Sequence, residues 1–251
     1  MKISKLNILA LSLLVLAAAT SCKKLSLQKD YNRTPRTVDP ELHKSAGKFL
    51  TDRATGVAAT NDTIFAWMLR GINYAGIDLA EYEKTGKTFV LLHNDAIRRV
   101  TKVSGNDSTQ PDCFFGANMV NGKVAQKWED YPQDFVRNSL LYLIANSVQD
   151  HYTMTLPDEN YDVATMAPEG FLNTLPPGIT RNVQSTGLGF IPNNNPKSLL
   201  RFRVTNSSPS NTSDYPIVLN DVRNVRTSSM LATNGSVHVI DRFLTTTLIP
   251  N

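Results

Sequence analysis

The chain has 251 residues, of which 41% are hydrophobic and 19% are charged, and its formal net charge is +4. Two of its 26 basic residues, Lys2 and Lys5, lie in a segment that we expect to be removed, so the mature chain carries a net charge of only +2. This balance does not indicate a nucleic-acid partner or a basic membrane-binding patch.

The first segment of the chain is similar to a bacterial lipoprotein signal. Two lysines precede an apolar run over 8–19, which is too short to span a bilayer but is typical of a signal peptide. It leads to Ala-Thr-Ser-Cys at 19–22, which resembles a lipobox with Ala in place of the usual Leu. We therefore expect residues 1–21 to be removed and Cys22 to be lipidated. The alternative is an ordinary secretory signal with an incidental cysteine.

Lipidation at Cys22 would decide the compartment. Acyl chains anchor a protein without a transmembrane helix, because each buried methylene contributes about 0.8 kcal/mol. Lys23 follows the cysteine in place of the Asp that is associated with inner-membrane retention in some bacteria, so we expect the outer membrane. Which face of that membrane the domain occupies stays open.

The mature chain is expected to contain a tether and one domain. Residues 22–40 are rich in charged and polar side chains that cannot bury much apolar surface, which predicts a flexible tether. Residues 41–251 have the length of a single domain. Cys113 is the one cysteine left after lipidation, which excludes an internal disulfide and a paired-cysteine zinc or redox site.

Helical patterns come first in this domain. Asn61 or Asp62 can cap a helix with apolar residues at 64, 65, 68, 69 and 72. A short helix over 78–84 and a strand over 88–92 follow. Asn94 or Asp95 can cap the next helix, whose apolar face would include Ala96, Ile97, Val100 and Val103. Residues 104–132 are rich in Gly, Asn, Asp and Pro and predict a long loop, and the last helix is expected over 133–148.

Strand patterns follow the helices. In 199–205, Leu200, Phe202 and Val204 alternate with polar residues, which predicts a strand with one buried face. Helices followed by strands indicate an α+β domain. The strands are expected over 151–156, 170–175, 179–183, 199–205, 217–225 and 237–244.

The most specific pattern lies near the end of the chain. Asn234-Gly235 predicts a tight turn, and Val-His-Val-Ile-Asp over 237–241 predicts the strand that follows it. This sequence resembles the last conserved segment of fasciclin (FAS1) domains, in which His238 and Asp241 would be structural. Thr-Phe-Val-Leu-Leu-His-Asn-Asp over 88–95 resembles the family's Thr-Val-Phe-Ala-Pro-Thr-Asp segment, with Asn94 and Asp95 at its end.

A further segment extends this resemblance. Leu140-Leu141-Tyr142 is similar to the family's Leu-Leu-Tyr-His, with Leu143 in place of the histidine that is linked to integrin recognition in animal members. The resemblance implies a single fasciclin-like domain, with helices of the N-terminal half packed on a wedge of mostly C-terminal strands. It also implies insertions near 104–132 and 186–214. Bacterial members of this kind look like accessory components of outer-membrane glycan-uptake systems. The resemblance therefore implies an adhesive or binding role without catalysis.

The residues themselves do not predict an active site. The four histidines are isolated, and none has the spacing that brings two imidazoles to one metal, so we expect no metal, no cofactor and no catalytic residues. Adjacent acidic pairs such as Asp158-Glu159 are the weak argument for the rival interpretation, a glycoside hydrolase. His238, between apolar neighbours, is expected to be a hydrogen-bonded core residue.

Two groups of side chains could serve binding. Aromatic residues in the expected loop could stack on sugar rings or fill a partner's groove, or they could fold back as a small core: Phe114, Phe115, Trp128 and Tyr131. Arginines on neighbouring strands could form a positive stripe for acidic glycans, or could be ordinary solvated side chains: Arg201, Arg203, Arg223, Arg226 and Arg242. The expected partner is a polysaccharide or an outer-membrane protein, with a purely structural protein–protein role as the alternative.

Overall fold

The computed structural model describes residues 39–57, 59–181, 197–206 and 215–244. The chain divides into Met1–Asp39 and Pro40–Asn251, and the second unit holds all the described helices and strands. The expected signal peptide, the lipidation site Cys22, nearly all of the tether and part of the insertion over 186–214 lie outside the described residues. The second unit mixes helices and several sheets, which confirms the α+β class.

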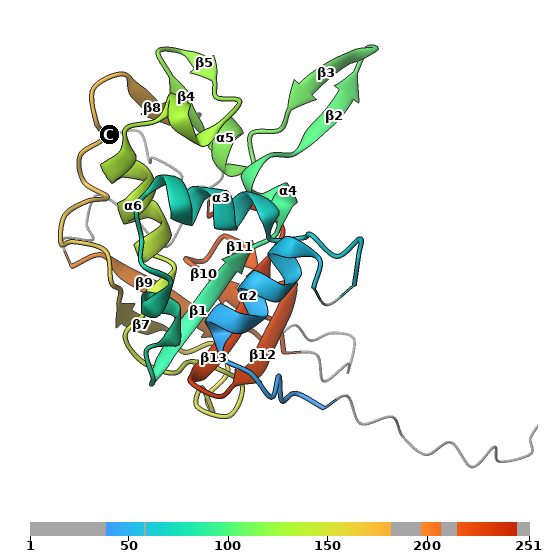
Figure 1. Ribbon diagram of the computed structural model, residues 1–251. Helices are drawn as coiled ribbons and strands as arrows, with labels where there is room; N and C mark the ends of the chain where they lie inside the picture. Colours follow the sequence, from blue (N-terminus) through green and yellow to red (C-terminus); the bar gives the residue numbers. More distant parts are fainter. Residues whose placement is uncertain (1–38, 58, 182–196, 207–214, 245–251) are drawn as a thin grey trace, which may run out of the picture. The chain divides into compact units, whose positions relative to one another are not determined.

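A four-stranded central sheet pairs two strongly apolar runs of the sequence (Figure 1). The strands β1 (Lys87–Leu92) and β13 (Gly235–Ile240) are parallel neighbours, and each buries five of its six residues. Such burial is typical of strands that are covered on both faces. The antiparallel strands β12 (Thr227–Ala232) and β6 (Ile144–Ala145) complete the sheet in the order β12-β13-β1-β6.

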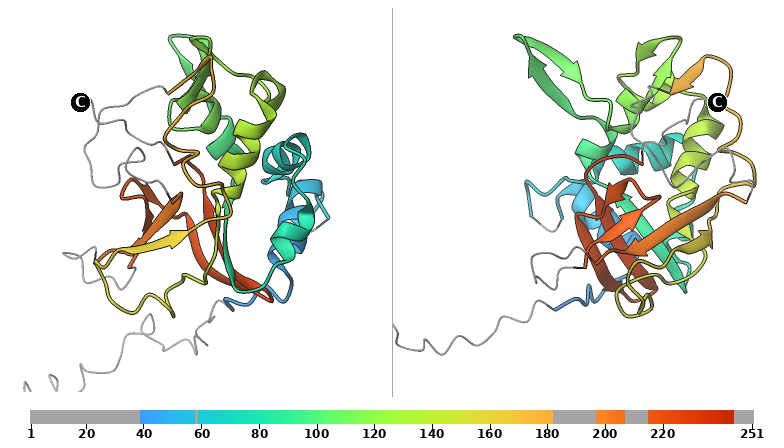
Figure 2. Two further views of the ribbon diagram at one scale, coloured as in Figure 1. Left: turned by 90° about the vertical axis from the view of Figure 1, so that its left-hand side faces the viewer. Right: turned by 180° about the vertical axis from the view of Figure 1, so that it is seen from behind.

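Helices cover one face of the central sheet and a second sheet covers the other (Figure 2). The helix α2 (Ala46–Thr55) and the 3-10 helix η2 (Leu79–Glu83) lie on the helical side. Phe202 of the second sheet contacts His238 of β13, with ring centroids 6.0 Å apart. The second sheet is antiparallel and consists of β11 (Arg223–Asn224), β10 (Ile217–Leu219), β9 (Leu199–Val204) and β7 (Tyr161–Ala164), in that order.

The remaining elements pack around the ends of these layers. A hairpin of β2 (Val100–Val103) and β3 (Asn106–Thr109) projects from the rest of the unit (Figures 1 and 2). The other elements are α3 (Ala66–Tyr74), α4 (Asn94–Ile97), α5 (Phe114–Ala117), η3 (Trp128–Asp130), α6 (Gln133–Leu141) and a sheet of β5 (Lys123–Val124), β4 (Asn118–Val120) and β8 (Ile179–Arg181).

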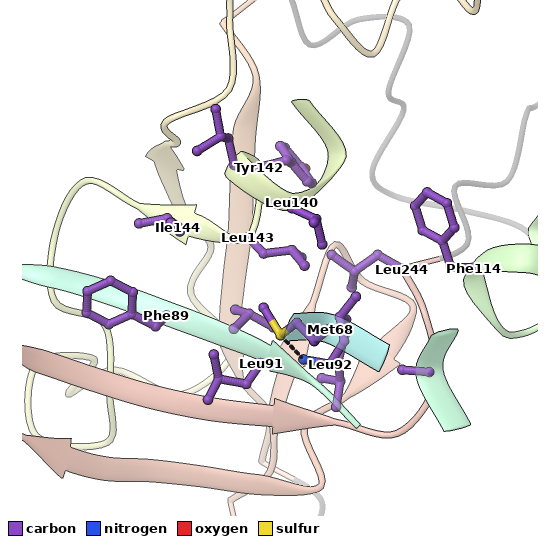
Figure 3. Close-up of a cluster of buried hydrophobic side chains, with 14 of the residues drawn as sticks. Met68, Phe89, Leu91, Leu92, Phe114, Leu140, Tyr142, Leu143, Ile144 and Leu244 are labelled. Carbon is purple, nitrogen blue, oxygen red and sulfur yellow. Dashed lines mark hydrogen bonds between the residues drawn. The ribbon is translucent and has the colours of Figure 1, made fainter. Parts of the chain in front are cut away.

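The hydrophobic core joins the helices to the central sheet. Figure 3 shows Met68 of α3 against Leu91 and Leu92 of β1, with the Met68 sulfur 3.1 Å from the Leu92 nitrogen. Leu140 of α6 and Phe114 of α5 enter the same cluster. Because these residues are spread over most of the domain sequence, the core depends on long-range contacts rather than on any one element.

The expected region 104–132 is not a long loop, and two expected helices are shorter than predicted. The region contains β3, α5, β4, β5 and η3, because its aromatic residues are drawn into the core. The helix expected from Asn94 ends at Ile97, and Val100 and Val103 belong to β2 instead. The helix expected over 133–148 ends at Leu141, and the chain continues into β6.

Three strand predictions are also wrong in detail. Residues 151–156 and 170–175 form turns and irregular structure. At the first, the Asp150 carboxylate accepts hydrogen bonds from the nitrogens of Tyr152 and Thr153, a local pattern that competes with strand formation. The strand expected over 217–225 is broken where Asn220 and Asp221 take positive φ angles of 49° and 59°.

The helix α2 and the strands β6, β7 and β12 are not among the elements that the sequence predicted. Helix α2 begins after Ser45, whose side chain accepts from the Lys48 nitrogen, and ends at Gly56 with a left-handed φ of 76°. These are standard start and stop signals. By contrast, β7 pairs with β9 along only four residues, and its sequence Tyr-Asp-Val-Ala is too short to be decisive.

Candidate ligand-binding site

The residues of the family-like segments hold elements together. Asn94 does not cap its own helix, because His93 occupies that position. Its side chain instead accepts from the nitrogen of Trp67 at 3.0 Å and donates to the oxygen of Thr63 at 2.8 Å. It therefore satisfies a first-turn N–H of α3, which has no side-chain cap of its own. The cap expected from Asn61 or Asp62 is wrong, and Asp62 forms an ion pair with Arg53.

The Asn234-Gly235 pair is a junction as well as a turn. The Asn234 amide accepts from the nitrogen of Ala46 at 2.9 Å and donates to the oxygens of Tyr82 and Lys84 at 2.8 and 3.2 Å, so it ties α2 and η2 to the hairpin. Asn234 has no positive φ, unlike the turn expected from the sequence. Glycine is required at 235 because a Cβ there would lie 2.0 Å from the Lys87 oxygen.

His238 is a core residue. Its Nδ1 accepts from the nitrogen of Ser229 at 3.1 Å, and its Nε2 lies 2.8 Å from the Gln149 oxygen, so Nε2 carries the proton. Burial lowers the pKa of His238 to about 4. A neutral, fully bonded imidazole in this position is suited to holding the structure together rather than to exchanging protons near neutral pH.

Tyr142, Asp95 and Asp241 complete the family-like set. The buried Tyr142 hydroxyl donates to the Leu199 oxygen at 2.7 Å and accepts from Asn220 at 3.0 Å, which links the end of α6 to the second sheet. Asp95 is about half exposed and lies 3.4 Å from His93 Nδ1. Asp241 forms ion pairs with Arg226 and Arg242, at 3.7 and 3.5 Å.

The four aromatic residues that were candidates for ligand binding are buried, so of the two alternatives the folded-back core is the one that the structure supports. Phe114 and Phe115 have no exposed surface, and Trp128 and Tyr131 are each 2% exposed. The Trp128 indole donates to the Trp67 oxygen at 2.9 Å, and the Tyr131 hydroxyl donates to the Asn118 oxygen at 2.6 Å. Their faces contact one another and Phe135, so no face is free to stack on a sugar.

The arginine stripe is largely neutralised by carboxylates. Arg201 pairs with Asp162 at 2.6 Å and with Asp221 at 3.0 Å, and Arg203 pairs with Asp221 at 3.2 Å. On the other side, Arg242 contacts Asp112 at 3.0 Å. The side chains of Arg201, Arg203 and Arg242 are thus paired with carboxylates of the protein, which argues against a positive stripe for acidic glycans.

A cavity lies elsewhere, between the β12 edge of the central sheet and the end of β9. Its volume is about 670 Å³, within the usual range for small-molecule sites. Among the described residues that line it, none is Asp, Glu, Lys or Arg. The lining residues are His151, Met154, Thr155, Pro157, Val204, Tyr215 and Ser228.

His151 fixes the position of the cavity walls. Its Nε2 lies 2.7 Å from the Tyr215 oxygen, and because a carbonyl only accepts, Nε2 carries the proton. Its Nδ1 then accepts from the Ser229 hydroxyl at 2.6 Å. The His151 nitrogen also donates to the same hydroxyl at 3.0 Å. The imidazole therefore joins the 150–157 turn, β12 and the segment before β10.

A serine hydroxyl beside a histidine also suits nucleophilic catalysis, but this geometry favours a structural role. The Ser229 side chain is buried, with 7% of the residue exposed, and Ser228 rather than Ser229 lines the cavity. Ser229 takes a positive φ of 55° at the irregular point of the β12–β13 pairing. The Ser229 hydroxyl thus ties this irregular point of β12 to His151 through two hydrogen bonds.

Comparison with known proteins assigns no family to the chain: no protein-family model matches it, and no curated protein matches it. None of the helices in the described part of the chain has the length and apolarity that a bilayer crossing needs. The described ranges also contain no group of three or more His, Cys, Asp or Glu residues placed to bind a metal ion.

Proposed function

We propose that this protein is a non-catalytic, lipid-anchored outer-membrane protein whose single fasciclin-like domain binds a neutral glycan through the cavity beside β12. The fasciclin-like part of the proposal draws support from β1 and β13, the strands of the two family-like segments, which are parallel neighbours. Asn94, Tyr142 and Asn234 in these segments each bridge elements far apart in the sequence. The lipid anchor and the outer membrane rest on the resemblance at 19–22 to a lipobox.

The observation that carries the glycan is the character of the cavity. An aromatic face and a small number of hydrogen-bonding groups suit a sugar ligand. Thr155 and Ser228 supply the hydrogen-bonding groups, and Tyr215, which is 42% exposed, supplies the aromatic face. The absence of ionised side chains from the described lining argues against a charged ligand, because such a ligand would be desolvated without a counter-charge.

The test is a binding survey with the full-length protein in detergent, against neutral and acidic polysaccharides. Tyr215→Ala removes the ring but keeps the carbonyl that bonds to His151, and Val103→Ala, an exposed residue of the β2–β3 hairpin, is the matched control. We expect neutral polysaccharides to bind and Tyr215→Ala to weaken binding about tenfold, or about 1.4 kcal/mol, with Val103→Ala unchanged. Preference for acidic polysaccharides, or no binding by folded protein, would contradict the proposal; the latter result favours the protein–protein role.

A further inference from the structure

Exposed apolar side chains occur in the chain segments that line the cavity. Tyr152 is 63% exposed, Leu156 is 58% exposed and Tyr215 is 42% exposed, and all three belong to the segments that line the cavity. The described residues contain only two other large apolar side chains with comparable exposure, Val57 and Val103, and each is on a different element. Three of the five large exposed apolar side chains among the described residues thus belong to these segments, and we call Tyr152, Leu156 and Tyr215 the apolar rim.

The interior within the rim is more polar. His151, Thr155 and Ser228 place hydrogen-bonding groups on the wall, although both ring nitrogens of His151 already have partners. An apolar rim and a polar interior suit a lipid, because its polar head group can enter the cavity while the apolar rim contacts the membrane around it. Tyr and Leu side chains commonly occupy the boundary between the head groups and the acyl chains of a bilayer.

The chain enters the domain along β12, the edge strand of the central sheet that also lines the cavity. The Pro40 oxygen accepts from the Leu231 nitrogen and the Leu42 nitrogen donates to the Leu231 oxygen, both at 2.8 Å. Ser228 of the cavity wall is three residues before Leu231 on the same edge strand, about 10 Å away at the usual rise per residue. The attachment point of the tether and the cavity thus share one edge of the domain.

We propose that the cavity binds the neutral glycan head group of a lipid in the membrane that holds the protein's own anchor. This inference rests on the proposed function, because it names the source of the glycan and depends on the anchor at Cys22. A tether over 23–39 reaches roughly 60 Å when fully extended, so a ligand in the same membrane lies within its range. The anchor confines the domain to the membrane surface, so the domain meets a lipid ligand there more often than a free protein would.

The lining also selects among lipids. Anionic head groups are recognised by clusters of Lys and Arg, and the described cavity lining contains neither. Asp158 and Glu159, which follow the lining residue Pro157, are exposed and add negative charge near the rim. A neutral sugar head group is therefore favoured over a phosphate-bearing one.

The experiment measures amide hydrogen exchange across 150–157 in the full-length lipidated protein reconstituted in vesicles. One arm uses phosphatidylcholine alone, the second adds digalactosyl diacylglycerol, and the third adds free galactobiose to phosphatidylcholine vesicles. We expect exchange to slow about tenfold in the second arm relative to the first and to slow much less in the third. Leu156→Ser should remove most of the protection in the second arm, whereas Val103→Ser should leave it unchanged.

Each other result separates the two proposals. Equal protection by free galactobiose, with no effect of Leu156→Ser, overturns the lipid source and leaves glycan binding standing. Equal protection in plain phosphatidylcholine overturns the head-group assignment. No protection in any arm, together with no binding in the polysaccharide survey, overturns both. Because Leu156 is exposed, unchanged thermal unfolding of Leu156→Ser verifies that the variant is folded.

Discussion

The buried imidazole of His238 makes the stability of the domain depend on pH. Burial lowers its pKa from an ordinary value of 6.5 to about 4, although its hydrogen bond to the Gln149 oxygen acts in the opposite direction. In the folded state Nδ1 faces the Ser229 N–H, so a proton added to Nδ1 would oppose an existing donor. The unfolded chain therefore binds a proton more readily than the folded chain as the pH falls through 6.5 toward 4.

The size of this effect follows from the two pKa values. One pKa unit corresponds to about 1.4 kcal/mol, so acidification from pH 7 to pH 5 should lower the free energy of unfolding by about 2 kcal/mol through His238 alone. The loss reaches about 3 kcal/mol once the pH is below the folded-state pKa. These values are a sizeable part of the stability of a typical domain, about 5–15 kcal/mol.

The assay is urea unfolding at pH 7, 6 and 5, followed by the fluorescence of the buried Trp128. His238→Gln keeps a side-chain donor for the Gln149 oxygen but does not titrate. It should be less stable at pH 7 by about 1–3 kcal/mol, because the buried nitrogen of Ser229 loses its partner Nδ1. Between pH 7 and pH 5 it should lose about 2 kcal/mol less than the unmutated protein. His43→Gln, a substitution of an exposed histidine, is the matched control. Unfolding free energies of the unmutated protein and His238→Gln that fall in parallel would refute the reasoning.

Three further predictions concern residues of the core and the family-like segments. Trp128→Ala should destabilise the domain by about 3–5 kcal/mol, because it empties a buried site and removes the bond to the Trp67 oxygen; a drop in polysaccharide binding at unchanged thermal stability would argue against its burial. Asn234→Ala leaves buried backbone groups without partners and should lower the urea-derived free energy by about 2–4 kcal/mol, and an effect below about 0.5 kcal/mol would contradict this role. Gly235→Ala places a Cβ against the Lys87 oxygen and should cost about 3 kcal/mol or more, measured by thermal unfolding; normal stability would show that β1 and β13 are not held in this register.

Local sequence patterns were enough for β1, β9 and β13, but not for β12 and β6 of the central sheet. The continuous apolar run at 88–92 and the alternation at 199–205 correspond to β1 and β9, because a strand's side-chain period is visible within a few residues. The Asn234-Gly235 pair correctly marked the hairpin before β13. The capping of short helices was harder, since Asn94 satisfies a distant helix rather than its own.

The candidate site was not predictable in the same way. Its walls come from the 150–157 turn, the end of β9, Tyr215 and β12, and no one of these segments carries a motif. A strand was expected over 151–156, where the structure has a turn that lines the cavity. The turn forms because the Asp150 carboxylate accepts a hydrogen bond from the Tyr152 nitrogen, which competes with strand pairing. Sequence inspection found the aromatic residues instead, since aromatic side chains in a polar region resemble a binding surface whether or not they fold inward.

By itself, the sequence determined the α+β class, the strands β1, β9 and β13 and the core position of His238, because these depend on side-chain periodicity and polarity that neighbouring residues reveal. Only the tertiary structure decided that β1 and β13 are parallel neighbours, that Phe114, Phe115, Trp128 and Tyr131 are buried, and that the cavity forms beside Ser228. The physical reason is that burial is a property of contacts between distant segments, and such contacts leave no periodic signal in either segment alone.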